Sequence, residues 1–354
     1  MTLEMHLMGG GIPPMTGALT LGGTCVTRRA ETYTQWAVMR TLVERRGFLK
    51  GMVGGAAGLA AASLFPALGE ARTQPTPLTL TPLSDTVTLV SGAGGNIVAL
   101  HSAEGVLLVD GGLEERTGEV LKALEPRVGK RPVVTAFNTH WHWDHTGSNE
   151  YLHKHGAKII AHENTRLWLG TEIWSEWENR TYKPRPAAAL PTETFYKTGK
   201  LSFGDEPVEY GWLGQAHTDG DIYVYFRRQN VLVAGDVLAV GSYPILDYST
   251  GGWIGGMQDA TQKLLDLTDE HTRFVPGTGP LLNKADVAAE HEMLATLRED
   301  FWQLMRKGYG AEDMIAARAT QKYDAKWGNA DLFIANAYRG LYGHTRSGEL
   351  RGAV

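Results

Sequence analysis

The sequence predicts a layered α/β fold in which helices cover the outside of β-sheets. Short β-type runs separated by glycine-rich turns are followed by segments with helical spacing, and this order occurs twice along the chain. The 354 residues are 43% hydrophobic and 21% charged, which is an ordinary globular composition with ample material for a core. A net charge of -5 provides no basic footprint for nucleic acid, so we expect no nucleic-acid partner.

The first set of elements covers roughly residues 86–169. Apolar runs bounded by glycines predict strands at 86–90, 96–100 and 106–109. Helical spacing predicts a helix over 114–124 that stops at Pro126. The run 133–138 is the next strand, Ser148 or Asn149 can begin a helix that reaches His155, and 158–161 and 163–169 are a strand and a helix.

A segment rich in tryptophan and proline, residues 171–199, separates the two sets, and we expect an irregular insertion lying over a site. Beyond it, β-prone runs predict strands at 208–213, 222–226, 231–234 and 273–276. Helical spacing predicts helices at 259–267, 284–306, 311–319 and 330–341.

The N-terminal region contains a sequence pattern that is typical of an export signal. Arg45-Arg46 followed by Phe48-Leu49-Lys50 resembles a twin-arginine motif, and a mildly apolar Gly/Ala stretch follows at 51–62, with small residues suited to cleavage at 67–71. This stretch is too short and too weakly apolar for a membrane span, so residues 39–72 are expected to be a cleaved signal peptide rather than a membrane anchor or an amphipathic tail.

This interpretation divides the chain into three parts. Residues 1–38 have no periodicity and are expected to be disordered or an over-extended gene start, with translation beginning at Met39; residues 73–354 form the mature domain, including the C-terminal helices. We expect a periplasmic or secreted protein that meets the twin-arginine export machinery and keeps no stable membrane span. The only cysteine, Cys25, precedes the signal, so the mature domain has no disulfide and no cysteine ligand.

The strongest chemical signal is the hexapeptide His140-Trp141-His142-Trp143-Asp144-His145, at the mouth of the predicted strand 133–138. Imidazole and carboxylate groups together suit zinc, with iron or manganese also possible. His217 and Asp236 follow two other predicted strands and can converge on the same place. His140, His142 and His217 would give one metal three nitrogens and an open position, and Asp144, His145 and a bridging Asp236 would hold a second.

The series Asp110, His140-x-His142-x-Asp144-His145, His217 and Asp236 resembles the metallo-β-lactamase superfamily over roughly residues 84–282. The resemblance implies a four-layer αβ/βα sandwich with one or two metal ions at an edge between two sheets. Gly235-Asp236 is similar to the hydroxyacylglutathione-hydrolase type. Zinc β-lactamases usually carry Cys or Ser there, which argues against an orthodox β-lactamase.

The resemblance also suggests roles for four further residues. The family's last motif, Pro-Gly-His-Gly, is here Pro276-Gly277-Thr278-Gly279, so Thr278 replaces a metal-binding histidine and the second site is expected to be weakened. Asp110 is not expected to bind the metal itself; it either orients a ligand histidine by a hydrogen bond or caps a turn. Tyr243 and Trp253 are candidate substrate-binding residues, with Tyr243 able to donate to an oxyanion, unless they serve only in loop packing.

The function implied is that of an exported metallo-hydrolase of small molecules. A metal-bound hydroxide would attack a carbonyl substrate such as a thioester, a lactone or a β-lactam-like amide, or else a sulfate or phosphate ester. Asp144 would be the catalytic residue that anchors the second metal and orients the nucleophile. Two alternatives remain open: a mononuclear iron dioxygenase of the persulfide type, and a non-catalytic periplasmic binding protein on the same scaffold.

Overall fold

The computed structural model describes residues 76–347. These residues all belong to one of two compact units of the chain, the unit that spans residues 65–354. The predicted signal peptide at 39–72 and the predicted extension at 1–38 lie outside the described residues. Within the described part of the chain, no helix is both long enough and apolar enough to cross a membrane.

The first sheet has seven strands and forms from the first half of the domain. Its order is β1 (Thr79–Pro82), β2 (Val87–Ala93), β3 (Gly95–Ser102), β4 (Gly105–Val109), β5 (Val133–Phe137), β6 (Lys158–His162) and β9 (Glu193–Phe195). The first three pairings are antiparallel, and β4, β5, β6 and β9 run parallel to one another. Because parallel strands end at the same edge, the polar residues after β4 and β5 lie together there.

The second sheet has five strands, in the order β10 (Thr198–Phe203), β11 (Glu206–Trp212), β12 (Ile222–Phe226), β13 (Val231–Gly235) and β14 (Arg273–Pro276). Only the pair β13 and β14 is parallel, and it brings Gly235 opposite Pro276. The loops that follow these two strands therefore begin side by side. The amide of Asn96 donates to the carbonyl of Gly277 at 2.6 Å, which joins the first sheet to this corner of the second.

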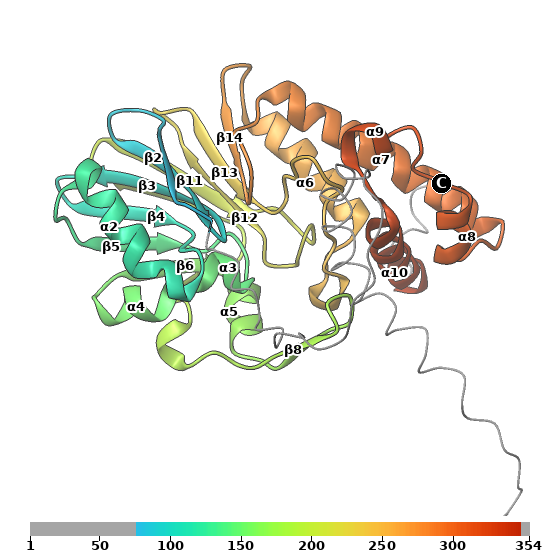
Figure 1. The fold of residues 1–354 in the computed structure, drawn as a ribbon, viewed down its shortest axis with the longest axis horizontal. Helices are drawn as coiled ribbons and strands as arrows, with labels where there is room; N and C mark the ends of the chain where they lie inside the picture. The colour runs from blue at the N-terminus through green and yellow to red at the C-terminus, as the bar shows by residue number, and fades with distance from the viewer. Residues whose placement is uncertain (1–75, 348–354) are drawn as a thin grey trace, which may run out of the picture. The chain divides into compact units, whose positions relative to one another are not determined.

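Three buried clusters define four layers. The sheets face each other across a core that includes Val98, Leu107, Val224 and Val233. The outer face of the first sheet packs on α2 (Thr117–Val128) and α4 (Asn149–Lys154), and that of the second on α6 (Ile254–Leu267), α7 (Lys284–Arg306) and α10 (Asp331–Ser347). Figure 1 shows these two groups of helices on opposite sides of the sheets. The predicted αβ/βα sandwich is confirmed.

The remaining elements are short. They are η1 (Glu114–Arg116), α3 (Trp143–Thr146), α5 (Glu163–Leu169), β7 (Ile173–Ser175), β8 (Arg180–Tyr182), η2 (Ala187–Ala189), η3 (Tyr248–Thr250), α8 (Ala311–Ala316) and α9 (Asp324–Trp327). The segment 171–199 is more regular than its composition predicts, because β7 and β8 form a hairpin and β9 joins the first sheet. Helix α2 also differs from the prediction: it includes Pro126 and ends only at Gly129, whose positive φ of 66° stops it.

Candidate metal centre

The metal-binding candidates meet at the edge where the two sheets come together. His140 and His142 follow β5, His217 follows β11, and Asp236 is the first residue after β13. These four residues each offer a ligand atom, and the four atoms lie within 4.8 Å of one another. Three strand ends from both sheets therefore contribute to one group, as the sequence predicts.

The three imidazoles converge on a common point. Nδ1 of His142 lies 3.0 Å from Nε2 of His217, and the ring of His140 lies edge-on to both rings, with centroids 4.7 and 4.8 Å away. Oδ2 of Asp236 closes the group at 3.8 Å from Nε2 of His140 and 3.6 Å from Nε2 of His217. The three histidines are buried, whereas Asp236 is partly accessible from outside.

The second oxygen of Asp236 faces a further histidine. Oδ1 lies 3.3 Å from Nε2 of His145, while Oδ2 faces His140 and His217. One carboxylate thus lies between the three-histidine group and His145, which is the arrangement that a bridging ligand requires. Asp144 is half-buried and Thr278 is exposed, and neither belongs to the four-residue group.

Asp110 fixes the first half of the centre. It follows β4 with a positive φ of 63°, and its carboxylate accepts hydrogen bonds from the amide and hydroxyl of Thr139, both at 2.8 Å. Its Oδ2 also lies 2.8 Å from Nδ1 of His145, and the Thr139 hydroxyl lies 3.1 Å from Nδ1 of His140. Two imidazoles are therefore oriented through their outer nitrogens, as in many metal sites.

Asp247 plays the same part for His142. Its Oδ2 lies 3.2 Å from Nε2 of His142 and accepts a hydrogen bond from the Thr250 hydroxyl at 2.6 Å. The indole N–H of Trp177 donates to Oδ1 of Asp247 at 3.1 Å, and that of Trp141 donates to Thr250 at 3.0 Å. The insertion that carries Trp177 is thus linked through Asp247 to the candidate ligand His142.

The loop that carries His217 is held by its backbone and by a buried acid. Nδ1 of His217 donates to the carbonyl of Ile245 at 2.7 Å, which directs Nε2 toward the centre. Asp221 accepts hydrogen bonds from the amide and the hydroxyl of Thr218, both at 2.8 Å. Thr218 therefore caps its own turn and does not contact the imidazoles.

Two glycines allow the close packing of this centre. A Cβ at Gly95 would lie 2.6 Å from Cε1 of His145, closer than any real side chain approaches. A Cβ at Gly277, next to Thr278, would overlap Oδ1 of Asp236. These residues leave room for the imidazole and the carboxylate that face each other across the centre.

The electrostatics separate the histidines into two kinds. Burial lowers the pKa of His140 well below its ordinary value, and burial also lowers the pKa of His217. Burial alone would lower the pKa of His145 as well, but Asp236 and Asp110 raise it well above the ordinary value. His140 and His217 are therefore held neutral, which is the form that binds a metal.

The donor set fits a divalent transition metal. Nε2 of His140 and Nε2 of His145 are buried without a hydrogen-bond partner, which is costly unless a cation or water meets them. Both atoms point at the carboxylate of Asp236. Imidazole nitrogens with one shared carboxylate match the ligands that zinc and neighbouring metals prefer.

The side chains of the two predicted substrate-binding residues pack against the helical layer. Tyr243 is buried against Phe333, and its hydroxyl lies 3.0 Å from Asp324 and 3.2 Å from the carbonyl of Thr320, so it is engaged in the helical layer. Trp253 precedes α6 and stacks on His344 with ring centroids 3.8 Å apart. Both side chains contribute to packing, which is the alternative that the sequence analysis left open for them.

Asp247 and Trp177 are the site residues that the sequence analysis missed. Asp247 lies 105 residues from His142 along the chain, and Trp177 lies 70 residues from Asp247. No local pattern marks Asp247, which lies between an apolar run and a tyrosine. The only signal was the abundance of tryptophan in the insertion.

Comparison with known proteins decides the family. A model of the metallo-beta-lactamase superfamily matches residues 90–284, more than half of the chain. The chain belongs to this superfamily. The matched region contains every candidate ligand and ends at the start of α7, so most of α7 and the helices that follow it lie beyond the match.

Relatives within the superfamily are distant in sequence. The chain is 25% identical over 185 residues to the metallo-beta-lactamase type 2 of Bacillus cereus, covering 52% of this chain and 66% of that protein. It is 27% identical over 183 residues to metallo-beta-lactamase IND-1 of Chryseobacterium indologenes, covering 51% and 70%. The chain thus spans about two thirds of the length of these superfamily relatives.

Two solved structures share the fold. A metallo-beta-lactamase from Pontibacter korlensis matches with a TM-score of 0.51 and 21% identity, over 62% of this chain and 99% of that one. The sec-alkylsulfatase Pisa1 from Pseudomonas sp. matches with a TM-score of 0.59 and 15% identity, over 74% of this chain and 50% of that one.

Proposed function

We propose that this protein is a metal-dependent hydrolase of small molecules that acts on a carbonyl substrate, such as a thioester, a lactone or a β-lactam-like amide. The observation that carries the proposal is the group formed by His140, His142, His217 and Asp236, whose ligand atoms lie within 4.8 Å of one another. Three nitrogen donors with one side open are typical of catalytic sites rather than structural ones.

The residues of the centre would have separate roles in binding and orienting the metal ions. His140, His142 and His217 would hold one divalent ion, with zinc the first choice, and His145, Asp144 and the bridging Asp236 would hold a second. When bound, such an ion supplies a Lewis acid for the carbonyl oxygen and lowers the pKa of water. Asp110 and Asp247 would keep two of the imidazoles in the required orientation.

One observation favours a second candidate function. Thr278 is exposed and outside the ligand group, so the His145 side of the centre has one nitrogen donor where the other side has three. A single occupied site would suit a mononuclear iron oxygenase of the persulfide type. Bound iron with oxygen consumption would support this alternative, and bound zinc with hydrolysis would support the first.

The experiment that tests the main proposal is a substrate screen on the metal-loaded protein. Ester, thioester, lactone and β-lactam compounds are compared, with a sulfate ester added because a sec-alkylsulfatase is among the structural relatives. We expect hydrolysis of at least one carbonyl class that is lost on metal removal. Hydrolysis of the sulfate ester alone would replace the proposed substrate class.

We further propose that the protein is exported through the twin-arginine route to the periplasm or beyond. The proposal is supported by Arg45-Arg46 and the Gly/Ala-rich stretch that follows, both outside the described residues. Replacing both arginines by lysine retains the charge and removes the motif. We expect the double variant to stay in the cytoplasm, and its appearance in the periplasm would refute the export signal.

A further inference from the structure

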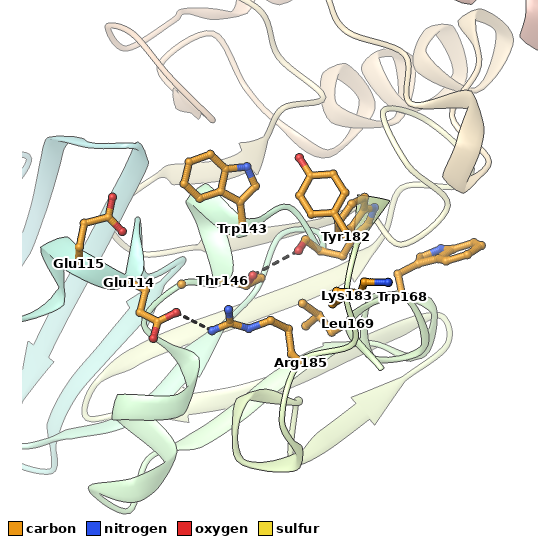
Figure 2. A pocket seen from close by; sticks show the side chains of 11 residues that line it. Glu114, Glu115, Trp143, Thr146, Trp168, Leu169, Tyr182, Lys183 and Arg185 are labelled. Atoms are coloured by element: carbon orange, nitrogen blue, oxygen red, sulfur yellow. Dashed lines mark hydrogen bonds and ion pairs between the residues drawn. The ribbon is translucent and has the colours of Figure 1, made fainter. Parts of the chain in front are cut away.

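A cavity of about 110 Å³ lies next to the metal motif. Its walls include Trp141, Trp143, Trp168 and Tyr182, and its rim includes Glu114, Glu115, Lys183 and Arg185. Figure 2 shows Trp143 and Tyr182 on one side of the cavity and the Glu114–Arg185 ion pair on the other. Aromatic walls with a charged rim are typical of small-molecule sites.

One wall of the cavity packs against a candidate metal ligand. Trp141 lines the cavity and also packs edge-on against the ring of His142, with centroids 4.4 Å apart. Trp143 lies between His142 and Asp144 in the chain, and 41% of its surface is exposed. A ligand in the cavity is therefore separated from a candidate metal ligand by a single aromatic ring.

Arg180 provides a positive charge beside these walls. Its guanidinium lies over the ring of Tyr182 at 4.5 Å and over the ring of Trp143 at 5.3 Å from the centroids. Two aromatic rings thus hold the planar group in place. Among the described residues, no carboxylate lies within ion-pair distance of Arg180, whereas Lys183 is paired with Glu172 at 2.5 Å and Arg185 with Glu114 at 2.8 Å.

The acidic groups near the cavity leave this charge available. Glu114 is neutralised by Arg185, and Glu178 accepts a hydrogen bond from the Tyr182 hydroxyl at 2.8 Å. Glu115 lies across the cavity from Tyr182 in Figure 2. A guanidinium with open donors, fixed on two rings, is a receptor for an oxyanion such as a carboxylate or a sulfonate.

We propose that the cavity and Arg180 form a substrate subsite that binds an apolar, preferably aromatic, group carrying a negative charge. The ring would lie in the cavity against Trp141, and the anionic group would meet the guanidinium of Arg180 where it packs on Trp143 and Tyr182. A dry cavity of roughly 150 Å³ holds benzene in another protein, so this cavity of about 110 Å³ would hold at most one ring, with part of the ligand outside it. The assignment of the ligand as part of a substrate rests on the proposed hydrolase function; the binding site itself does not.

The test compares two probes of nearly equal size on the metal-loaded protein. Benzenesulfonate carries the charge, and methyl phenyl sulfone lacks it. Binding is measured by titration calorimetry and by quenching of tryptophan fluorescence. We expect the wild type to bind the sulfonate about tenfold or more tightly than the sulfone, because a charge-assisted contact contributes that much.

Variants of Arg180 then test whether this residue causes the preference for the sulfonate over the sulfone. Arg180→Gln should abolish it, and Arg180→Lys, which keeps the charge but not the planar stacking, should retain part of it. The matched control is Arg227→Gln, which removes another stacked arginine, 4.5 Å over Tyr225, and should leave the preference unchanged.

Three outcomes would overturn the proposal: no saturable binding of benzenesulfonate, equal affinity for both probes, or a preference that survives Arg180→Gln. The last outcome would assign the anion to the metal centre instead. Because no turnover is measured, an absence of hydrolysis would refute the proposed function without affecting this result.

Discussion

The carboxylate of Asp247 lies 3.2 Å from Nε2 of His142, while Nδ1 of the same imidazole lies 3.0 Å from Nε2 of His217. One nitrogen of His142 is therefore held by an acid, and the other points into the candidate metal centre. The outer partner of this imidazole should therefore contribute to metal binding, because it fixes the orientation of the ring.

Asp247→Asn should weaken metal binding while the fold is retained. Asparagine keeps the shape of the side chain but loses the charge that orients His142, and changes of this kind reduce metal affinity by about 10–100-fold. Competition with a chromophoric chelator measures the effect. Asp266→Asn, a change at an exposed carboxylate on α6, is the control and should titrate like the wild type. An unchanged affinity in Asp247→Asn would show that His142 needs no outer partner.

Glu290 should make stability depend on pH. It is fully buried on α7, it accepts a hydrogen bond from the amide of Ala239 at 3.2 Å, and burial raises its pKa to about 8. The folded state therefore keeps a proton that the unfolded chain loses near its ordinary pKa, so stability falls as the pH rises between these two values.

Glu290→Gln should remove this dependence. We expect the stability of the variant relative to the wild type to increase as the pH rises from about 5 to about 9. At the upper end, the free energy of unfolding should differ by an amount on the order of a few kcal/mol. Denaturant unfolding at several pH values checks this. The control is Glu292→Gln, at an exposed position on the same helix. A constant difference across the pH range would mean that Glu290 is ionised in the folded protein.

Thr278→His should strengthen the second metal site. Thr278 is exposed and follows Gly277, at which an added Cβ would overlap Oδ1 of Asp236, so we expect an imidazole at position 278 to reach the His145 side of the centre. A regained nitrogen ligand should increase the affinity for a second ion by about 10–100-fold or more.

Chelator titration distinguishes the outcomes for this variant. The wild type should lose one ion early, and Thr278→His should lose both together at higher chelator. Thr198→His, at an exposed position on β10, is the control. Identical curves for the wild type and Thr278→His would place residue 278 out of reach of the metals.

Much of the fold could be predicted because it follows local patterns. The predicted helix at 284–306 agrees with α7, where Asn283 forms a capping box with Asp286. The ends of β11 and β13 lie at one edge because both strands pair with β12, and the packing of the two sheets brings the end of β5 to the same edge. The four-residue ligand group could be predicted for the same reason, since its members follow those strands.

The parts that could not be predicted depend on contacts across long stretches of chain. Asp247 is 105 residues from His142, and Trp177 is 70 residues from Asp247, so no spacing rule connects them. Tyr243 follows a ligand closely in sequence, yet the helical layer buries it against Phe333. Which side of a loop an aromatic residue occupies is decided by the elements that pack on it, and these lie far away in the sequence.

The central claim is that His140, His142, His217 and Asp236 bind a metal ion. The most direct test is the metal-to-protein ratio, determined by elemental analysis, for the wild type and for His142→Ala. The wild type should contain at least one divalent transition-metal ion per chain, and the variant should lose it because two nitrogens and one carboxylate are too few ligands. A His142→Ala protein that keeps the wild-type metal content would contradict the account.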